Sequence, residues 1–144
     1  MNARELQAIE GRLSLRTPQR EALEILAHVS GSLTLKKDAD PASALSVVKG
    51  LAPTVEDFER GFPSLCFALA TGVGKTRLMG AFIAYLYRVH GLKHFFVLAP
   101  NLTIYEKLKA DFTYGTPKFV FPGLGDIRDN LVLITGDDWE DGRG

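Results

Sequence analysis

The 144-residue sequence has a single cysteine, Cys66, and no excess charge, because 17 lysines and arginines balance 17 aspartates and glutamates. One cysteine cannot close an intramolecular disulfide, so a disulfide scaffold is excluded and a reducing, cytoplasmic setting is expected. Zero net charge does not favour a globally basic nucleic-acid binder, although a local basic strip can still contact phosphates. The apolar runs are too short to cross a bilayer, and no signal-peptide pattern follows the first residues. We therefore expect no membrane partner.

The composition is nevertheless that of a folded protein. Hydrophobic residues make up 46% of the chain, which is enough for the core of one compact domain. Apolar runs and turn residues predict strands over residues 64–70, 93–99 and 131–134, with a short one at 118–121. We expect Cys66 to lie in the first of these as a small buried hydrophobic residue.

Helical periodicity alternates with these strands. It predicts helices near residues 3–13, over 17–29, from 41, briefly from 53, over 75–89, and from a cap at Asn101 to about 112. Thr17 is the expected cap of the second helix, and Asp40 precedes the third. Alternating strands and helices from residue 64 onward predict an α/β fold with a parallel sheet.

A glycine-rich segment stands between the first predicted strand and the helix after it. Residues 71–76 read Thr71-Gly72-Val73-Gly74-Lys75-Thr76. Glycines allow a backbone to curl around phosphate groups, and the following helix adds open N–H groups and a partial positive charge. Lys75 is placed to reach the β- and γ-phosphates, and Thr76 to ligate Mg²⁺. The alternative is a glycine-rich turn with an exposed lysine, but the flanking strand and helix favour phosphate binding.

Three segments in order resemble motifs of the superfamily 2 helicases, the group that includes the DEAD/DEAH-type enzymes. Residues 15–23, with Gln19, are similar to the glutamine motif, residues 69–76 to motif I, and residues 98–104 to motif Ia. Leu69 replaces the first glycine of a strict phosphate loop, as is common in that family. More narrowly, the chain resembles the ATP-dependent subunit of type III restriction endonucleases.

The resemblance implies a phosphate-loop NTPase with a RecA-like sheet, ATP and Mg²⁺ as cofactors, and duplex DNA and a modification subunit as partners. Gln19 is then the candidate for reading adenine, since an amide offers both a donor and an acceptor; a polar residue in a first helical turn is the plainer alternative. Arg77 would lie near the nucleotide, or be an exposed helix arginine. In the family, the segment matching Pro100, Asn101 and Leu102 touches the nucleic-acid backbone; a capped helix start is the alternative.

The acidic pair that such motors use for hydrolysis has no clear counterpart. Asp137-Asp138-Trp139-Glu140 follows a predicted strand, but Thr135 and Gly136 intervene, so we interpret the segment as a turn. We expect residues 1–63 to form a helical region with the glutamine motif, and residues 64–144 to be the first part of a RecA-like domain. The sequence then reads as the N-terminal part of a longer motor that is inactive alone. A non-catalytic nucleotide-binding module and a small phosphate-loop kinase remain as alternatives.

Overall fold

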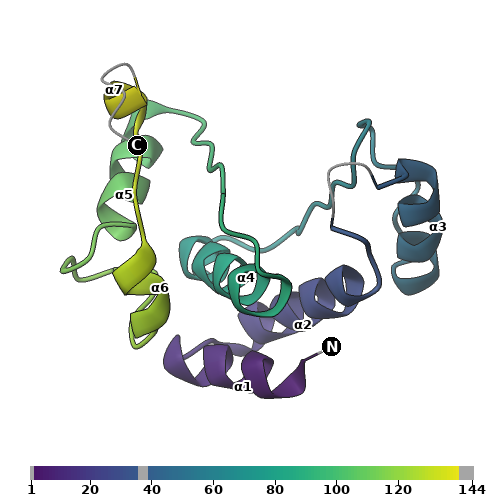
Figure 1. Ribbon diagram of the computed structural model, residues 1–144, viewed down its shortest axis with the longest axis horizontal. Coiled ribbons are helices and arrows are strands. Elements are labelled where there is room, and N and C mark those ends of the chain that lie inside the picture. Colours follow the sequence, from purple (N-terminus) through teal and green to yellow (C-terminus); the bar gives the residue numbers. More distant parts are fainter. Residues whose placement is uncertain (1, 36–38, 140–144) are drawn as a thin grey trace.

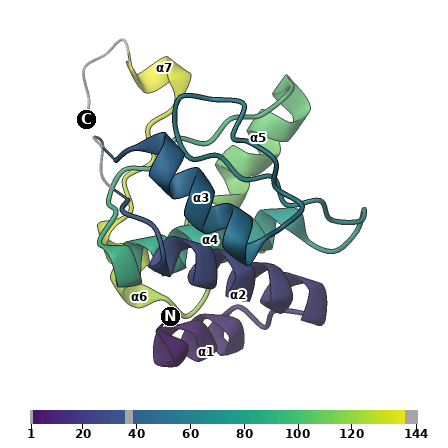
Figure 2. The same cartoon turned by 90° about the vertical axis from the view of Figure 1, so that its right-hand side faces the viewer.

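The computed structural model describes residues 2–35 and 39–139, and the described part is helical (Figure 1). In chain order the helices are α1 (Ala3–Arg12), α2 (Thr17–Gly31), α3 (Pro41–Leu51), α4 (Lys75–His90), α5 (Leu102–Asp111), α6 (Gly125–Asn130) and α7 (Gly136–Trp139). Helices α1, α2 and α4 lie together in the middle, with α3 at one end and α5 and α6 at the other (Figure 1). In Figure 2 the α3 side faces the viewer, and α1 lies at the base below α2.

The expected α/β fold with a RecA-like parallel sheet is wrong for the described residues, which contain no strand. Residues 64–70, 92–99 and 131–135 lie outside the helices, but they form no strand ladder with one another. An apolar run favours burial of its side chains, whereas a sheet also needs a second backbone about 4.8 Å away. Here that second condition is not met, so the local pattern overpredicted strands.

The segment before α4 shows how these apolar runs are used instead. Phe67 and Leu69 turn toward the main core, and the Phe67 ring meets Phe82 of α4 edge to face at 4.8 Å. Cys66 lies on the other side and is exposed, so the prediction of a buried cysteine is wrong. Alternation puts every second side chain outward, and no second layer covers that side within the described residues.

Most helix ends lie where the capping and terminating residues of the sequence indicate. Asp40 caps α3, and hydrogen bonds from the Ser43 hydroxyl and from the first backbone N–H groups hold the pKa of its carboxyl below the usual value. Asn101 caps α5 by accepting from the N–H of Ile104 at 2.9 Å. Gly91 ends α4 in the left-handed conformation, as a helix-terminating glycine does. The cap of α2 is Arg16, one residue before the predicted Thr17.

Other local expectations fail. Residues 53–60 contain a turn at 53–54 and a bend at 59–60 but no helix, and 118–121 is not a strand. Helix α6 was not expected from the sequence, and the turn expected after Thr135 and Gly136 is the single helical turn α7. In α7 the carboxylate of Asp138 accepts from the N–H and hydroxyl of Thr135, which fixes the start of that turn. Glu140 lies outside the described residues.

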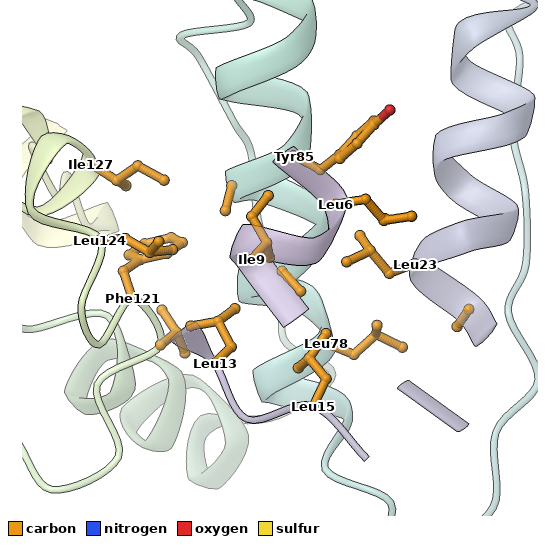
Figure 3. Close-up of a cluster of buried hydrophobic side chains, with 14 of the residues drawn as sticks. Leu6, Ile9, Leu13, Leu15, Leu23, Leu78, Tyr85, Phe121, Leu124 and Ile127 are labelled. Atoms are coloured by element: carbon orange, nitrogen blue, oxygen red, sulfur yellow. The ribbon is translucent and has the colours of Figure 1, made fainter. Parts of the chain in front are cut away.

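The main core forms where α1, α2 and α4 meet. Figure 3 shows Leu6 and Ile9 of α1 pointing toward Leu23 of α2 and Leu78 of α4. Tyr85 is fully buried, and its hydroxyl accepts from the N–H of Asn2 at 3.4 Å. This core joins residues on both sides of the boundary expected at 63/64, and the division into two regions remains a prediction.

The α6 end adds Phe121, Leu124 and Ile127 to the same core (Figure 3). Arg88 of α4 reinforces it by donating to both carboxylate oxygens of Asp126, which lowers the pKa of that carboxyl. A smaller cluster of Val29, Ala44, Val48 and Phe58 attaches α3 to α2. None of the helices in residues 2–35 and 39–139 is long and apolar enough to cross a membrane.

Candidate functional site

The glycine segment 71–76 forms a turn that opens directly into α4. Gly72 and Gly74 have φ angles of 83° and 84°, a left-handed conformation in which a side chain is strained. Helix α4 begins at Lys75, and no side chain of the described residues caps its start. The first N–H groups of a helix have no intrahelical partner. This turn therefore presents open N–H groups at the positive end of a 16-residue helix.

Two side chains at the start of α2 donate hydrogen bonds to backbone carbonyls of the glycine turn. The Arg16 guanidinium donates to the carbonyl of Gly72 at 2.9 Å, and the Gln19 amide nitrogen donates to the carbonyl of Gly74 at 2.9 Å. The Gln19 amide oxygen accepts from the backbone N–H of Arg16 at 2.8 Å. Because both glycine carbonyls are engaged by donors of α2, neither oxygen is free to face an approaching anion.

Gln19 lies at the predicted nucleotide site, and the hydrogen-bond partners of its amide are backbone atoms of the chain. The residue is 2% exposed, and each end of its amide bonds to the backbone of residue 16 or 74. One donor hydrogen and one acceptor lone pair remain on the amide. Adenine reading by Gln19 stays a prediction, while its contact with the glycine turn is a structural fact.

The hydroxyl of Thr76 faces a cation supplied by the chain itself. Lys107 of α5 donates from its ammonium to Thr76 Oγ1 at 3.3 Å and to Asp111 Oδ2 at 2.6 Å. The Asp111 side chain is only 8% exposed, whereas that of Lys107 is 46% exposed. The oxygen predicted to ligate Mg²⁺ thus lies next to a positively charged ammonium in this structure.

The remaining predicted nucleotide residues are placed differently. Thr71 and Lys75 are exposed at the front of the turn, and Val73 is half-buried. Arg77 donates to the carbonyl of Leu13 at 3.2 Å and so ties the start of α4 to the end of α1. Its predicted nearness to the nucleotide is not tested, but its guanidinium has a structural partner.

Residues 100–102 lie at the start of α5, with Leu102 73% exposed. Asn101 uses its side-chain oxygen to cap the helix, which is the plainer of its two predicted roles. Lys107 lies five residues after Leu102, about 8 Å along the helix axis. Helix α5 therefore connects the candidate nucleic-acid segment with the hydroxyl of Thr76.

The sequence motifs assigned neither Asp111 nor Lys107 to the nucleotide site. Their spacing of four residues was an available signal for an ion pair on one helix. Nothing local could show that this pair lies against Thr76, because the contact joins α5 to α4.

The open N–H groups at the start of α4 are an arrangement that can bind an anion. The family description "type III restriction enzyme, res subunit" matches residues 12–127, a span that includes α2, the glycine turn, α4 and α5. The chain therefore belongs to that family. Proteins of this family are helicase-type hydrolases of restriction systems that generally use ATP and Mg²⁺ and act on DNA with a modification subunit. Neither the curated proteins nor the solved structures contain a match to this chain.

Proposed function

We propose that this chain binds ATP at residues 71–76 and serves as the ATP-binding part of a DNA helicase or translocase motor in a restriction system. The observation that carries the proposal is the clamp on the glycine turn by Arg16 and Gln19. It engages the two glycine carbonyls and leaves the uncapped N–H groups of α4 for phosphate oxygens. The family supports ATP as the nucleotide.

The side chains have distinct roles in this proposal. Backbone groups of Thr71 to Gly74 surround the phosphates, and the exposed ammonium of Lys75 pairs with the β- and γ-phosphates. Thr76 supplies a hydroxyl ligand to Mg²⁺, which neutralises phosphate charge when bound. Gln19 positions the turn and, if adenine reaches its free donor and acceptor, reads the base.

Contact with DNA is proposed for Pro100, Asn101 and Leu102. All three are exposed, and they lie at a helix start, where backbone N–H groups can contact DNA phosphates without reading sequence. The modification subunit is a proposed partner on the strength of the family alone.

Nucleotide binding by the 144-residue chain is measured by isothermal titration calorimetry with ATP and Mg²⁺. Loss of a charged contact worth about 1.5–3 kcal/mol predicts that Lys75→Ala weakens binding roughly 10- to 150-fold. Lys49→Ala, which removes an exposed lysine from α3, is the matched control and should bind normally. Equal affinity of Lys75→Ala and the unaltered chain would overturn the proposal.

Duplex-DNA binding is measured in parallel by fluorescence anisotropy at low salt. Leu102→Glu places a carboxylate at a helix N-terminus, which the helix tolerates but DNA phosphates repel. Phe96→Glu is the control, because Phe96 is 88% exposed on a segment outside the proposed contact. A larger loss of DNA affinity for Leu102→Glu is expected, and equal losses contradict the DNA assignment.

A further inference from the structure

A groove lies between α2 and α3, at the end of the molecule where α3 stands (Figure 1). Its volume is about 530 Å³, within the range of roughly 300–1,000 Å³ that is usual for binding clefts. None of the residues proposed for nucleotide or DNA contact lines it. The α2–α3 groove is lined by five side chains of α2 and one from the end of α3, namely Glu21, Glu24, Ile25, His28, Val29 and Leu51.

The α2–α3 groove exposes apolar surface from both helices. Ile25 of α2 is 50% exposed and Leu51 of α3 is 37% exposed, although both are large aliphatic side chains. Val29, one helical turn after Ile25, is buried in the small cluster that joins the two helices. A partner that covers Ile25 and Leu51 would therefore extend an existing apolar cluster and remove both side chains from water.

The side of the groove formed by α2 is also acidic. Glu21 and Glu24 are exposed, and neither forms an ion pair with another side chain of the described residues. Arg20 precedes Glu21 in the chain, but it does not line the groove and donates instead to Thr17 Oγ1 at 3.3 Å. Two carboxylates about 4.5 Å apart along the helix axis thus lie beside the apolar surface without a compensating lysine or arginine.

This combination of charge and apolar surface limits what the groove can bind. Within residues 2–35 and 39–139, no three His, Cys, Asp or Glu side chains are placed to hold a metal ion. The two carboxylates repel DNA phosphates and anionic lipid head groups. A free polyamine would pair with the carboxylates but leave Ile25 and Leu51 in water.

We infer that the α2–α3 groove docks a basic amphipathic helix of a partner protein. The apolar face of that helix covers Ile25 and Leu51, and its lysines or arginines pair with Glu21 and Glu24. A helix laid into a groove is a common mode of peptide recognition, and residues three or four apart on one helix match the spacing of the two carboxylates. The inference is independent of the proposed nucleotide site.

The first experiment measures binding of a designed peptide to the unaltered chain by fluorescence anisotropy. The probe is a labelled helix with leucines along one face and lysines beside them. We expect saturable binding, and roughly tenfold weaker binding of two twin peptides, one with glutamate for every lysine and one with serine for every leucine. Absence of saturable binding, equal binding of the serine twin, or complete displacement of the probe by equimolar spermidine would overturn the inference.

The second experiment tests the two carboxylates of the groove. Glu21→Gln/Glu24→Gln should weaken binding of the lysine peptide roughly 2- to 30-fold, the range expected for two exposed ion pairs. Glu56→Gln/Glu106→Gln removes the same charge at exposed positions outside the groove and should bind like the unaltered chain. Equal losses for the two double variants mean that the peptide only senses overall charge, which contradicts docking in the groove.

The apolar contact has its own matched pair of variants. Ile25→Ala should weaken peptide binding roughly fivefold or more, as truncation of a central apolar contact does. Ile134 is 49% exposed and lies outside the groove, so Ile134→Ala should leave the affinity unchanged. Substitutions at such exposed positions usually change stability little, and a thermal melt of each variant verifies its folding. Equal affinities of Ile25→Ala and Ile134→Ala would refute the proposed contact.

Discussion

Gly74 is constrained both by its backbone conformation and by a close contact with Gln19, and one substitution tests both. Its φ angle is +84°, and a Cβ built on it would lie 2.5 Å from Gln19 Nε2. The amide end of a glutamine is ordinarily flexible, but this one is buried and its oxygen is bound to the N–H of Arg16. Gly74→Ala therefore strains the backbone and also displaces the side chain that clamps the turn.

The expected loss of stability is the sum of the backbone strain and the lost hydrogen bond. A left-handed conformation costs a non-glycine residue roughly 1–2 kcal/mol. Loss of the hydrogen bond from Gln19 to the Gly74 carbonyl adds about 0.5–1.5 kcal/mol. We expect Gly74→Ala to lower the free energy of unfolding by about 1.5–3.5 kcal/mol in total.

Gly72 is the matched control in the same turn. Its φ angle is +83°, but a Cβ there meets nothing within 4 Å, so Gly72→Ala should cost only the backbone term of about 1–2 kcal/mol. Urea denaturation of each variant gives the free energies of unfolding. The same pair is then measured in a Gln19→Ala background, where the excess cost of Gly74→Ala should disappear. Equal costs of the two variants, or an excess that persists without Gln19, would refute the described contact.

Two further predictions concern stability away from the turn. A Cβ on Gly80 of α4 would lie 2.7 Å from the carbonyl oxygen of Val120, so Gly80→Ala should destabilise by about 1–2 kcal/mol. Gly50 of α3 has open space, so Gly50→Ala should stabilise by about 0.5–1 kcal/mol, and thermal unfolding that ranks these variants in the opposite order contradicts the packing described. Burial, with a smaller contribution from nearby Glu24, raises the pKa of the Glu10 carboxyl, so its charged form costs stability above that pKa and costs nothing once the group is protonated. Glu10→Gln should therefore add stability at pH 7, and this gain should fade as the pH falls through the raised pKa toward the ordinary value of 4.5. Urea titrations across this pH range measure it, with the variant Glu21→Gln at an exposed site of α2 as the control.

The helices were largely predictable because their signals are local. Asp40 and Asn101 cap the helices they precede, as the sequence indicated. The predicted bounds of α1, α2, α4 and α5 agree with the structure to within about two residues, which is the usual uncertainty of helix ends. Helix α6 was missed, because six residues carry too little periodicity to distinguish a short helix from a loop.

The candidate site was predictable in part. The order of glycines, Lys75 and Thr76 before a helical pattern located the turn and the helix start, both of which the structure has. The clamp by Gln19 and the contact of Lys107 with Thr76 were not predictable, since each joins residues more than 30 positions apart in the chain.

The amino-acid sequence by itself determined the helix boundaries, the left-handed glycines of the turn and the family of the chain, because these depend on neighbouring residues and on the order of motifs. The tertiary structure decided what surrounds the turn: the amide of Gln19 behind it and the ammonium of Lys107 at Thr76. It also decided that the apolar segments from 64 and 92 form no strand ladder with each other within the described residues. An apolar run specifies only that its side chains avoid water, whereas strand pairing requires a second backbone that no local pattern can supply.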